Sequence, residues 1–208
     1  MQTLDRPTPP PNEWAEPAWD VALLFPNQGA WSVGEYLALE TNRLVEFSHG
    51  SIEVLPMPSD RHQSIVAYLF GILLAYAQQT GGKVLFAPFR LQLWPGKLRE
   101  PDLVFLAAAD DPRREDPFWN GADLVVEVVS PDDPHRDLVT KRFEYARAGI
   151  PEYWIVDPRD ESITVLHLAD EQSASPYAEH GRFSRGDMAD SPSFEKLVFD
   201  VTAVFDAP

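Results

Sequence analysis

The sequence contains no cysteine, which excludes disulfide bonds, thiolate nucleophiles and cysteine-ligated metal clusters. Long apolar runs are also absent, since no stretch approaches the roughly 20 apolar residues of a membrane-spanning helix. The Pro-rich, polar segment MQTLDRPTPPPNEWAEP lacks the apolar core of a secretory signal. We therefore expect a cytoplasmic protein with no membrane partner.

Basic residues are scarce, because 17 Lys and Arg stand against 33 Asp and Glu for a net charge of −16. Such an acidic surplus repels phosphate backbones and argues against routine nucleic-acid binding. The surplus is uneven: residues 83–147 carry ten Lys and Arg against twelve Asp and Glu, a balance of −2. The rest of the chain carries the other −14, so the acidity lies mostly in the flanks.

Several common catalytic motifs are missing as well. The sequence has no glycine-rich phosphate loop, no dinucleotide-binding fingerprint and no histidine-rich zinc spacing. Ser130 is not part of a glycine elbow and has no matched histidine, which argues against a serine hydrolase.

The length of 208 residues, 44% of them hydrophobic, is enough for one domain with a sizeable core. We interpret residues 1–20 as a Pro-rich N-terminal arm and residues 21–208 as a single domain. No internal repeat or domain-sized linker divides residues 21–208.

Helix and strand patterns alternate along this domain. The strongest helix begins after Ser59, a good N-cap, and ends at Gly81, while shorter helices are predicted over 31–39 and 136–149. Besides the strand around Glu127, the predicted strands are two within 43–57 around a turn at His49-Gly50, then 84–94, 101–107, 152–158 and 163–168.

The connections between these elements complete the fold prediction. We expect strands 84–94 and 101–107 to form a hairpin and residues 169–192 to form a polar loop, whereas the pattern over 194–205 decides nothing. Hairpin-connected strands together with a strand–helix–strand unit indicate an α/β fold with a mixed β-sheet flanked by helices.

The stretch LVVEVVSPDD raises a specific question about Glu127. Its Val-rich run is typical of a strand buried on both faces, with the charged Glu127 in its middle. A buried carboxylate is costly unless it is paired or coordinates a cation. We therefore expect Glu127 to face either a cationic side chain or a metal ion.

Three further residues complete a candidate metal site. Asp102 begins a strand that, if it neighbours the strand of Glu127, brings both carboxylates to one end of the sheet. Mg²⁺ prefers oxygen ligands of this kind, and the carbonyl of Val128 would add another. Lys141, in the next helix, would activate water or stabilise charge on a breaking phosphodiester.

The same residues could instead have purely structural roles, with no metal ion and no catalysis. Glu127 would then pair with a buried arginine such as Arg90 or Arg142, and Asp102 would cap a turn. Lys141 would form an exposed helix pair with Asp137, worth only about 0.3–0.5 kcal/mol.

The ordered segments SDRHQSIVAYLFGILLAY, EPDLVFL, LVVEVVSPDD and RDLVTKRFEYARAGIPEYWIVDP resemble a large family of bacterial restriction-endonuclease-like proteins within the PD-(D/E)XK nuclease superfamily. The resemblance extends over roughly residues 33–205. It implies a restriction-endonuclease-like α/β/α core and Mg²⁺-dependent cleavage of phosphodiester bonds, with Mn²⁺ as an alternative ion.

The resemblance also implies roles for individual residues. Asp102 would be the motif aspartate, Glu127 the second acidic ligand and Lys141 the catalytic lysine. The usual motif places that lysine two residues after the second acid, where this sequence has Val129. Lys141, in the following helix, is the replacement that the resemblance implies, because members of this family carry the lysine at this displaced position.

Four other residues have weaker claims to the site. Glu46 would add an acidic group or lie on a solvated edge, and His62 would contact a phosphate, act as an accessory base or simply face solvent. Asp137 would orient Lys141, whereas Tyr145 is expected to serve packing.

The predicted function is that of a Mg²⁺-dependent endonuclease acting on DNA, although the net charge of −16 disfavours a DNA partner; two alternatives stay open. The first is a non-catalytic nucleic-acid-binding or assembly module on the same fold. The second is a metal-dependent hydrolase of a small phosphorylated substrate, which suits the low basicity. A homodimer is expected, since enzymes that cut both strands commonly pair two sites.

Overall fold

The computed structural model describes residues 25–41, 43–169 and 175–208. The arm predicted over residues 1–20 lies outside these ranges. Within them the chain alternates helices and strands, and no helix of the described residues is long and apolar enough to cross a membrane.

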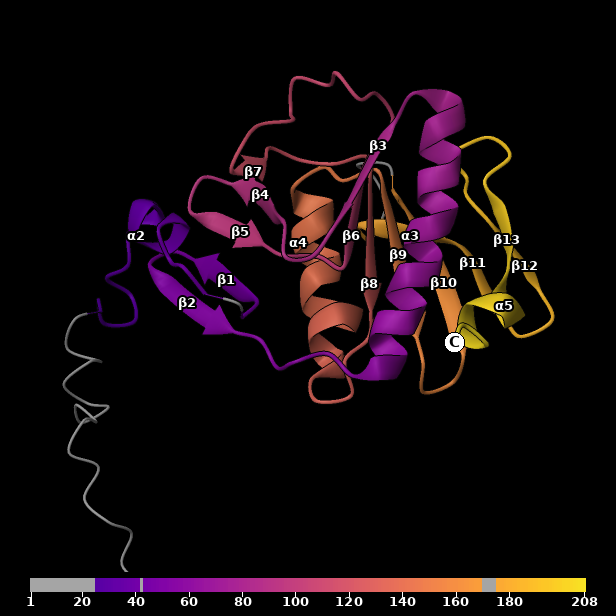
Figure 1. Ribbon diagram of the computed structural model, residues 1–208, viewed down its shortest axis with the longest axis horizontal. Helices are drawn as coiled ribbons and strands as arrows, with labels where there is room; N and C mark the ends of the chain where they lie inside the picture. The colour runs from indigo at the N-terminus through magenta and orange to yellow at the C-terminus, as the bar shows by residue number, and fades with distance from the viewer. Residues whose placement is uncertain (1–24, 42, 170–174) are drawn as a thin grey trace, which may run out of the picture.

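A six-stranded mixed sheet forms the centre of the molecule (Figure 1). Strand β8 runs parallel to β9, and the other neighbouring pairs are antiparallel. In spatial order the strands are β11 (Tyr177–Ser184), β10 (Ser162–Leu168), β9 (Glu152–Asp157), β8 (Leu124–Val128), β6 (Leu103–Leu106) and β3 (Lys83–Phe86).

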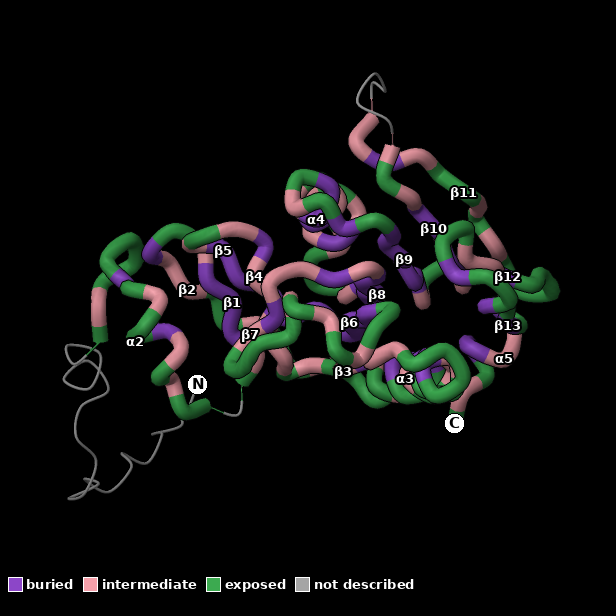
Figure 2. The backbone as a smooth tube through the Cα atoms, turned by 90° about the horizontal axis from the view of Figure 1, so that it is seen from above, coloured by how far each residue is buried: buried purple, intermediate pink, exposed green. Residues whose placement is uncertain are grey.

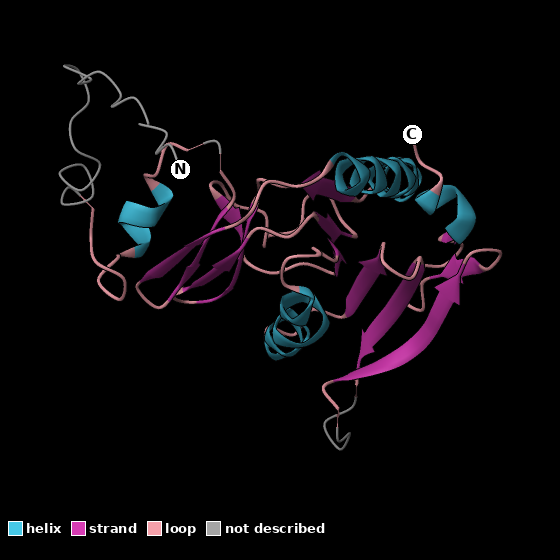
Figure 3. Cartoon of the chain, turned by 90° about the horizontal axis from the view of Figure 1, so that it is seen from below, coloured by secondary structure: helices cyan, strands magenta, loops and turns pink. Residues whose placement is uncertain are grey.

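Helices cover both faces of this sheet, with α3 (Asp60–Thr80) on one side and α4 (Lys141–Arg147) on the other (Figures 2 and 3). The short α5 (Val201–Phe205) packs beside α3. Side chains alternate between the faces, so Val126 joins the core under α3 while Val125 joins the core under α4. The predicted mixed sheet flanked by helices is therefore confirmed.

A second sheet stands beside the central one and carries helix α2 (Val33–Leu37). Its own small core includes Trp31, Tyr36 and Phe47. Its strands, in spatial order, are β2 (Ser51–Val54), β1 (Val45–Ser48), β5 (Lys97–Arg99), β4 (Arg90–Trp94) and β7 (Phe118–Trp119). A third, two-stranded sheet pairs β12 (Met188–Asp190) with β13 (Val198–Asp200).

Local signals located several elements correctly. Ser59 caps α3 by accepting a hydrogen bond from the His62 backbone, and Gly81 ends it in the left-handed conformation at φ 83°. The predicted turn at His49-Gly50 joins β1 and β2. The helix predicted over 136–149 begins as a π-helical turn, η1 (Arg136–Thr140), and continues as α4.

Two predictions about the sheets were wrong. Residues 84–94 form two strands in different sheets, because Pro88 between them has no N–H to donate to a ladder. β3 pairs with β6 as expected of the hairpin, but β4 turns away to pair with β5.

The polar stretch 169–192 is also not simply a loop, since β11 and β12 lie in it. β11 is polar because it forms the edge of the central sheet and leaves most of its side chains partly or fully exposed. Residues 194–205, which the pattern left unassigned, form β13 and α5.

Candidate active site

Asp102 and Glu127 are brought together by the pairing of β6 with β8. The antiparallel register matches Leu103 with Val126, so the next position along each strand places Asp102 opposite Glu127. Oδ2 of Asp102 accepts a hydrogen bond of 2.7 Å from the backbone N–H of Val128. Asp102 is thus held across the strand pair and does not cap a turn.

Glu127 points toward α4, because its strand neighbours Val125 and Val129 pack in the core on that side. Its Oε1 lies 2.8 Å from Nζ of Lys141 and accepts a hydrogen bond from the Tyr145 hydroxyl. Lys141 and Tyr145 are four residues apart, which places both on one face of the helix.

Lys141, the predicted lysine of the following helix, therefore contacts Glu127, the second predicted carboxylate. Val129, at the usual place of that lysine, is buried in the core. Nζ of Lys141 also lies 2.9 Å from Oδ1 of Asp137, and both side chains are 5% exposed. The Asp137–Lys141 pair is therefore buried, and the prediction of an exposed helix pair was wrong.

Neither arginine considered as a partner of Glu127 contacts it. Arg90 lies 3.5 Å from Glu100 and over the ring of Tyr36. Arg142 donates to the carbonyl of Tyr177 and to the Ser175 hydroxyl. Lys141 is the cationic partner of Glu127.

His62 completes the cluster from the first turn of α3. Its Nε2 lies 3.3 Å from Oδ2 of Asp102, and its buried Nδ1 has no partner among the described residues. Burial alone would lower the pKa of His62, but the hydrogen bond and charge of Asp102 and the charge of Glu127 raise it. His62 is therefore a site-facing histidine and not a solvent-facing one.

The cleft cluster, defined as Asp102, Glu127, Asp137 and Lys141, has three carboxylates and one ammonium group. Burial is the main reason that the pKa of Glu127 is raised, and the charges of Asp102 and Asp137 add to it against the opposing effect of Lys141. Lys141 has a raised pKa in spite of burial, because the carboxylates around it favour its charged form. The cluster has unbalanced negative charge and favours a further cation.

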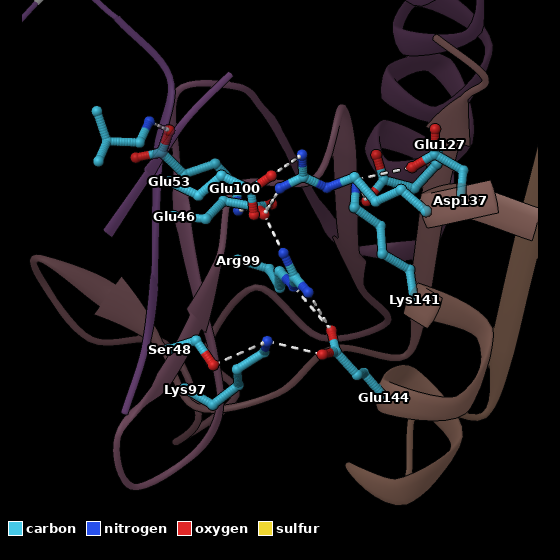
Figure 4. A network of polar contacts seen from close by, with 12 residues as sticks. Glu46, Ser48, Glu53, Lys97, Arg99, Glu100, Glu127, Asp137, Lys141 and Glu144 are labelled. Carbon is cyan, nitrogen blue, oxygen red and sulfur yellow. Dashed lines mark hydrogen bonds and ion pairs between the residues drawn. The ribbon is translucent and has the colours of Figure 1, made fainter. Parts of the chain in front are cut away.

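Glu46 belongs to a different set of contacts, which Figure 4 shows beside the cleft cluster. It is 1% exposed, accepts hydrogen bonds from Arg99 and Arg136, and does not line the cleft described below. Burial alone would raise the pKa of Glu46, but Lys141, Arg99 and Arg136 together lower it to about 2. Its carboxylate is occupied by arginines and is not an open ligand.

These contacts form the sheet–helix network, which joins the second, five-stranded sheet to η1 and α4. Arg99 and Lys97 both contact Glu144 of α4, at 2.7 Å each. Arg136 of η1 lies 2.8 Å from Glu53 of β2. The members are Glu46, Glu53, Lys97, Arg99, Arg136 and Glu144.

A cleft of about 470 Å³ opens over the cleft cluster. The segment from Leu55 to Pro58 supplies an apolar wall, and the β8–η1 loop supplies a polar one. Seven carboxylates and four cationic side chains line it: Glu53, Glu100, Asp102, Glu127, Asp132, Asp133 and Asp137 with Arg61, Arg136, Lys141 and Arg159. Val128 lines the same cleft, as do all the predicted site residues except Glu46.

Sequence reasoning missed two residues at this site. Tyr145 was expected to serve packing, yet its hydroxyl donates to Glu127. Glu100 also lines the cleft, and burial raises its pKa to about 7 against the lowering effects of the Val45 N–H and Arg90. The spacing of Tyr145, four residues after Lys141, was the only available signal for the tyrosine; the position of Glu100 before Pro101-Asp102 was too common to be one.

The donor set fits a Mg²⁺ ion. Within the described parts of the chain, Oδ1 of Asp102 and Oε2 of Glu127 accept no hydrogen bond, so each carboxylate has an oxygen free. No group of three or more His, Cys, Asp or Glu side chains among the described residues has the arrangement of a metal site. Mg²⁺ requires less, because one or two carboxylates with water or substrate phosphate commonly hold it.

Comparison with known proteins identifies the family and the fold of the chain. Residues 33–202 match the model of the Uma2 family, described as "Putative restriction endonuclease". A solved structure from Anabaena variabilis, described as a "putative nuclease", superposes with a TM-score of 0.68 and 21% identity, covering 85% of this chain and 98% of that one. At that identity the likeness shows the fold. No curated protein matches.

Proposed function

Since the chain belongs to the Uma2 family, we propose that it is a Mg²⁺-dependent endonuclease that hydrolyses phosphodiester bonds in DNA. The observation that carries the proposal is the cleft cluster. Asp102 and Glu127 face each other at the floor of a cleft, each with a free oxygen, and the only ammonium group of the cluster touches Glu127.

Asp102 and Glu127 would hold the ion, with the carbonyl of Val128 as a further oxygen ligand. When bound, Mg²⁺ supplies positive charge that stabilises the negative charge developing on the scissile phosphate. The hydrogen bond from the Val128 N–H fixes Asp102, and the Tyr145 hydroxyl with Lys141 fixes Oε1 of Glu127. Both carboxylates are therefore oriented before any substrate arrives.

Lys141 would stabilise charge on the phosphate or orient the attacking water. Asp137 positions it, because its Oδ1 contacts Nζ while its Oδ2 accepts a hydrogen bond of 3.4 Å from the Ser130 N–H. His62, beside Asp102, would be an accessory group for the phosphate or a proton.

Calorimetric titration with Mn²⁺, which takes the same oxygen ligands as Mg²⁺, tests the metal site. We expect the wild type to bind, and folded Asp102→Asn and Glu127→Gln variants not to bind. Asp132→Asn removes an exposed acid of the same cleft and is the matched control, expected to bind nearly as wild type. Loss of binding only in the control would move the site away from Asp102 and Glu127.

A cleavage assay then tests the activity. With Mg²⁺ or Mn²⁺, the wild type should cut supercoiled plasmid DNA, and Asp102→Asn, Glu127→Gln and Lys141→Met should each lose at least about 100-fold in rate. The proposal fails if the wild type cuts neither plasmid nor single-stranded DNA with either ion while a known nuclease cuts in parallel.

A second candidate is the hydrolysis of a small phosphorylated molecule. The cleft of about 470 Å³, with more carboxylates than cations in its lining, favours it. Clefts of roughly 300–1,000 Å³ are usual for small ligands. Cleavage of bis(p-nitrophenyl) phosphate by a protein that leaves DNA intact would select this function.

A further inference from the structure

Arg136 differs from the other described cations of the cleft. Lys141 is held by two carboxylates at the floor, and the side chains of Arg61 and Arg159 are 53% and 45% exposed in surface pairs. The Arg136 side chain is 13% exposed and lines the cleft at the start of η1. It is a sheltered guanidinium beside the cleft cluster.

The two partners of Arg136 hold it with different strength. Glu46 is buried and binds one terminal nitrogen, whereas the side chain of Glu53 is 58% exposed and lies 2.8 Å from the other. Breaking a buried ion pair is costly, but an exposed one contributes little. The contact to Glu53 is thus the one that a competing anion can replace.

The donor capacity of Arg136 is not exhausted by these contacts. Its Nε donates no hydrogen bond to any residue that the structure describes. Because the Nε–H points to the Nη2 side of the guanidinium, where Glu46 lies, the nitrogen presented to the cleft when Glu53 leaves is Nη1, while Glu46 keeps its place. A charge-assisted hydrogen bond from this guanidinium nitrogen is of the kind that phosphate oxygens accept.

We propose that Arg136 binds a phosphate group of the substrate and that Glu53 is the exchangeable carboxylate which the phosphate displaces. The inference rests on the proposed function, because it names the group that takes a phosphate of the DNA strand beside the scissile one. Glu46 is then the positioning residue that holds Arg136 toward the cleft.

Fluorescence anisotropy with a labelled single-stranded DNA oligonucleotide, in buffer with Ca²⁺ replacing Mg²⁺, tests the exchange. Glu53→Gln should tighten binding about two- to fivefold, since the phosphate no longer competes with a carboxylate. Arg136→Lys keeps the charge but has one nitrogen in place of the two that would contact Glu46 and the phosphate, so it should weaken binding about tenfold. Gel electrophoresis of the probe confirms that it stays intact.

A double-mutant cycle separates the exchange from general repulsion. Glu53→Gln and Asp132→Asn both remove one negative charge from the cleft lining, but Glu53 alone contacts Arg136. In an Arg136→Lys background the gain from Glu53→Gln should vanish, while any gain from Asp132→Asn should persist. Equal gains from both substitutions in both backgrounds would overturn the proposal, as would no binding by the wild type and by Glu53→Gln.

Failure of this proposal is distinguishable from failure of the nuclease function. Cleavage by the wild type with Mg²⁺, together with unchanged binding in Arg136→Lys and Glu53→Gln, leaves the nuclease standing and removes Arg136 from phosphate binding. Binding that follows the predicted cycle in a protein that never cleaves keeps Arg136 and removes the nuclease.

Discussion

The cleft cluster and the sheet–helix network both combine carboxylates with cationic side chains, and they differ in their charge balance. The network sets three carboxylates against three cations, and its Glu46 has a pKa of about 2. The cleft cluster sets three carboxylates against one ammonium, and its Glu127 has a raised pKa. Both carboxylates are buried, at 1% and 3% exposure, so burial does not explain the difference.

The charge balance distinguishes the structural network from the candidate site in this molecule. In the network each buried charged side chain contacts a side chain of opposite charge, and these ion pairs join the second, five-stranded sheet to η1 and α4. In the cleft cluster the surplus negative charge is unfavourable to the folded protein and favourable to a bound cation. The same substitution, Glu to Gln, should therefore have opposite effects in the two clusters.

The largest effect is expected in the network. Glu46→Gln leaves Arg99 and Arg136 without their shared buried charge, and it should lower the free energy of unfolding by about 3–5 kcal/mol. Denaturation with urea at pH 7 measures the loss. Glu53→Gln makes the same change at the exposed partner of Arg136 and should cost at most about 1 kcal/mol. Equal losses in the two variants would contradict the comparison.

Glu127→Gln should do the reverse and raise the free energy of unfolding by about 1–3 kcal/mol at pH 8 without divalent ions. The neutral amide still accepts from Lys141 and Tyr145 but removes one surplus charge. A marked loss of stability would show that Lys141 balances Glu127 fully.

The pH dependence of this gain follows from the raised pKa of Glu127. The folded protein holds the proton more tightly than the unfolded chain, so stability contributed by the protonated carboxyl is complete below the usual pKa of 4.5 and is lost as pH rises through the folded value. The advantage of Glu127→Gln should accordingly be large at pH 8 and vanish by about pH 4. An advantage independent of pH would have another cause.

A smaller effect is expected at Tyr145, whose neutral hydroxyl donates a hydrogen bond to Glu127 of the cleft cluster. Tyr145→Phe removes the hydroxyl that donates to Glu127 and should lower the free energy of unfolding by about 1–2 kcal/mol at pH 8. Tyr76→Phe is the control, because that hydroxyl donates to no described residue and Tyr76 packs on Phe105 and Phe194. Similar losses in both would remove the special role of Tyr145.

The elements that the sequence predicted best have strong local signals, namely helix caps and apolar patterns within one segment. The caps at Ser59 and Gly81 and the apolar period of α3 lie within one segment, as does the Val-rich run of β8. Residues 84–94 and β11 were misjudged because their pairing depends on neighbours far along the chain: β4 turns to β5, and β11 uses β10 to form a polar edge.

The candidate site divides in the same way. The order of Asp102, Glu127 and Lys141 was sufficient to nominate them, and the resemblance of the surrounding segments pointed to a nuclease family. The contacts of Glu46 were beyond such reasoning, because Arg99 and Arg136 lie 53 and 90 residues away from it. Nothing in a four-residue strand indicates whether its glutamate meets two arginines or an open cleft.

The sequence by itself determined the ends of α3, the strand around Glu127 and which acidic residues are surrounded by apolar neighbours, because propensity, capping and periodicity act over a few residues. Only the tertiary structure decided which of those acids are balanced. The pKa of a buried carboxylate depends on the charges within a few ångströms of it, and here those charges come from strands and helices that the chain brings together from distant positions.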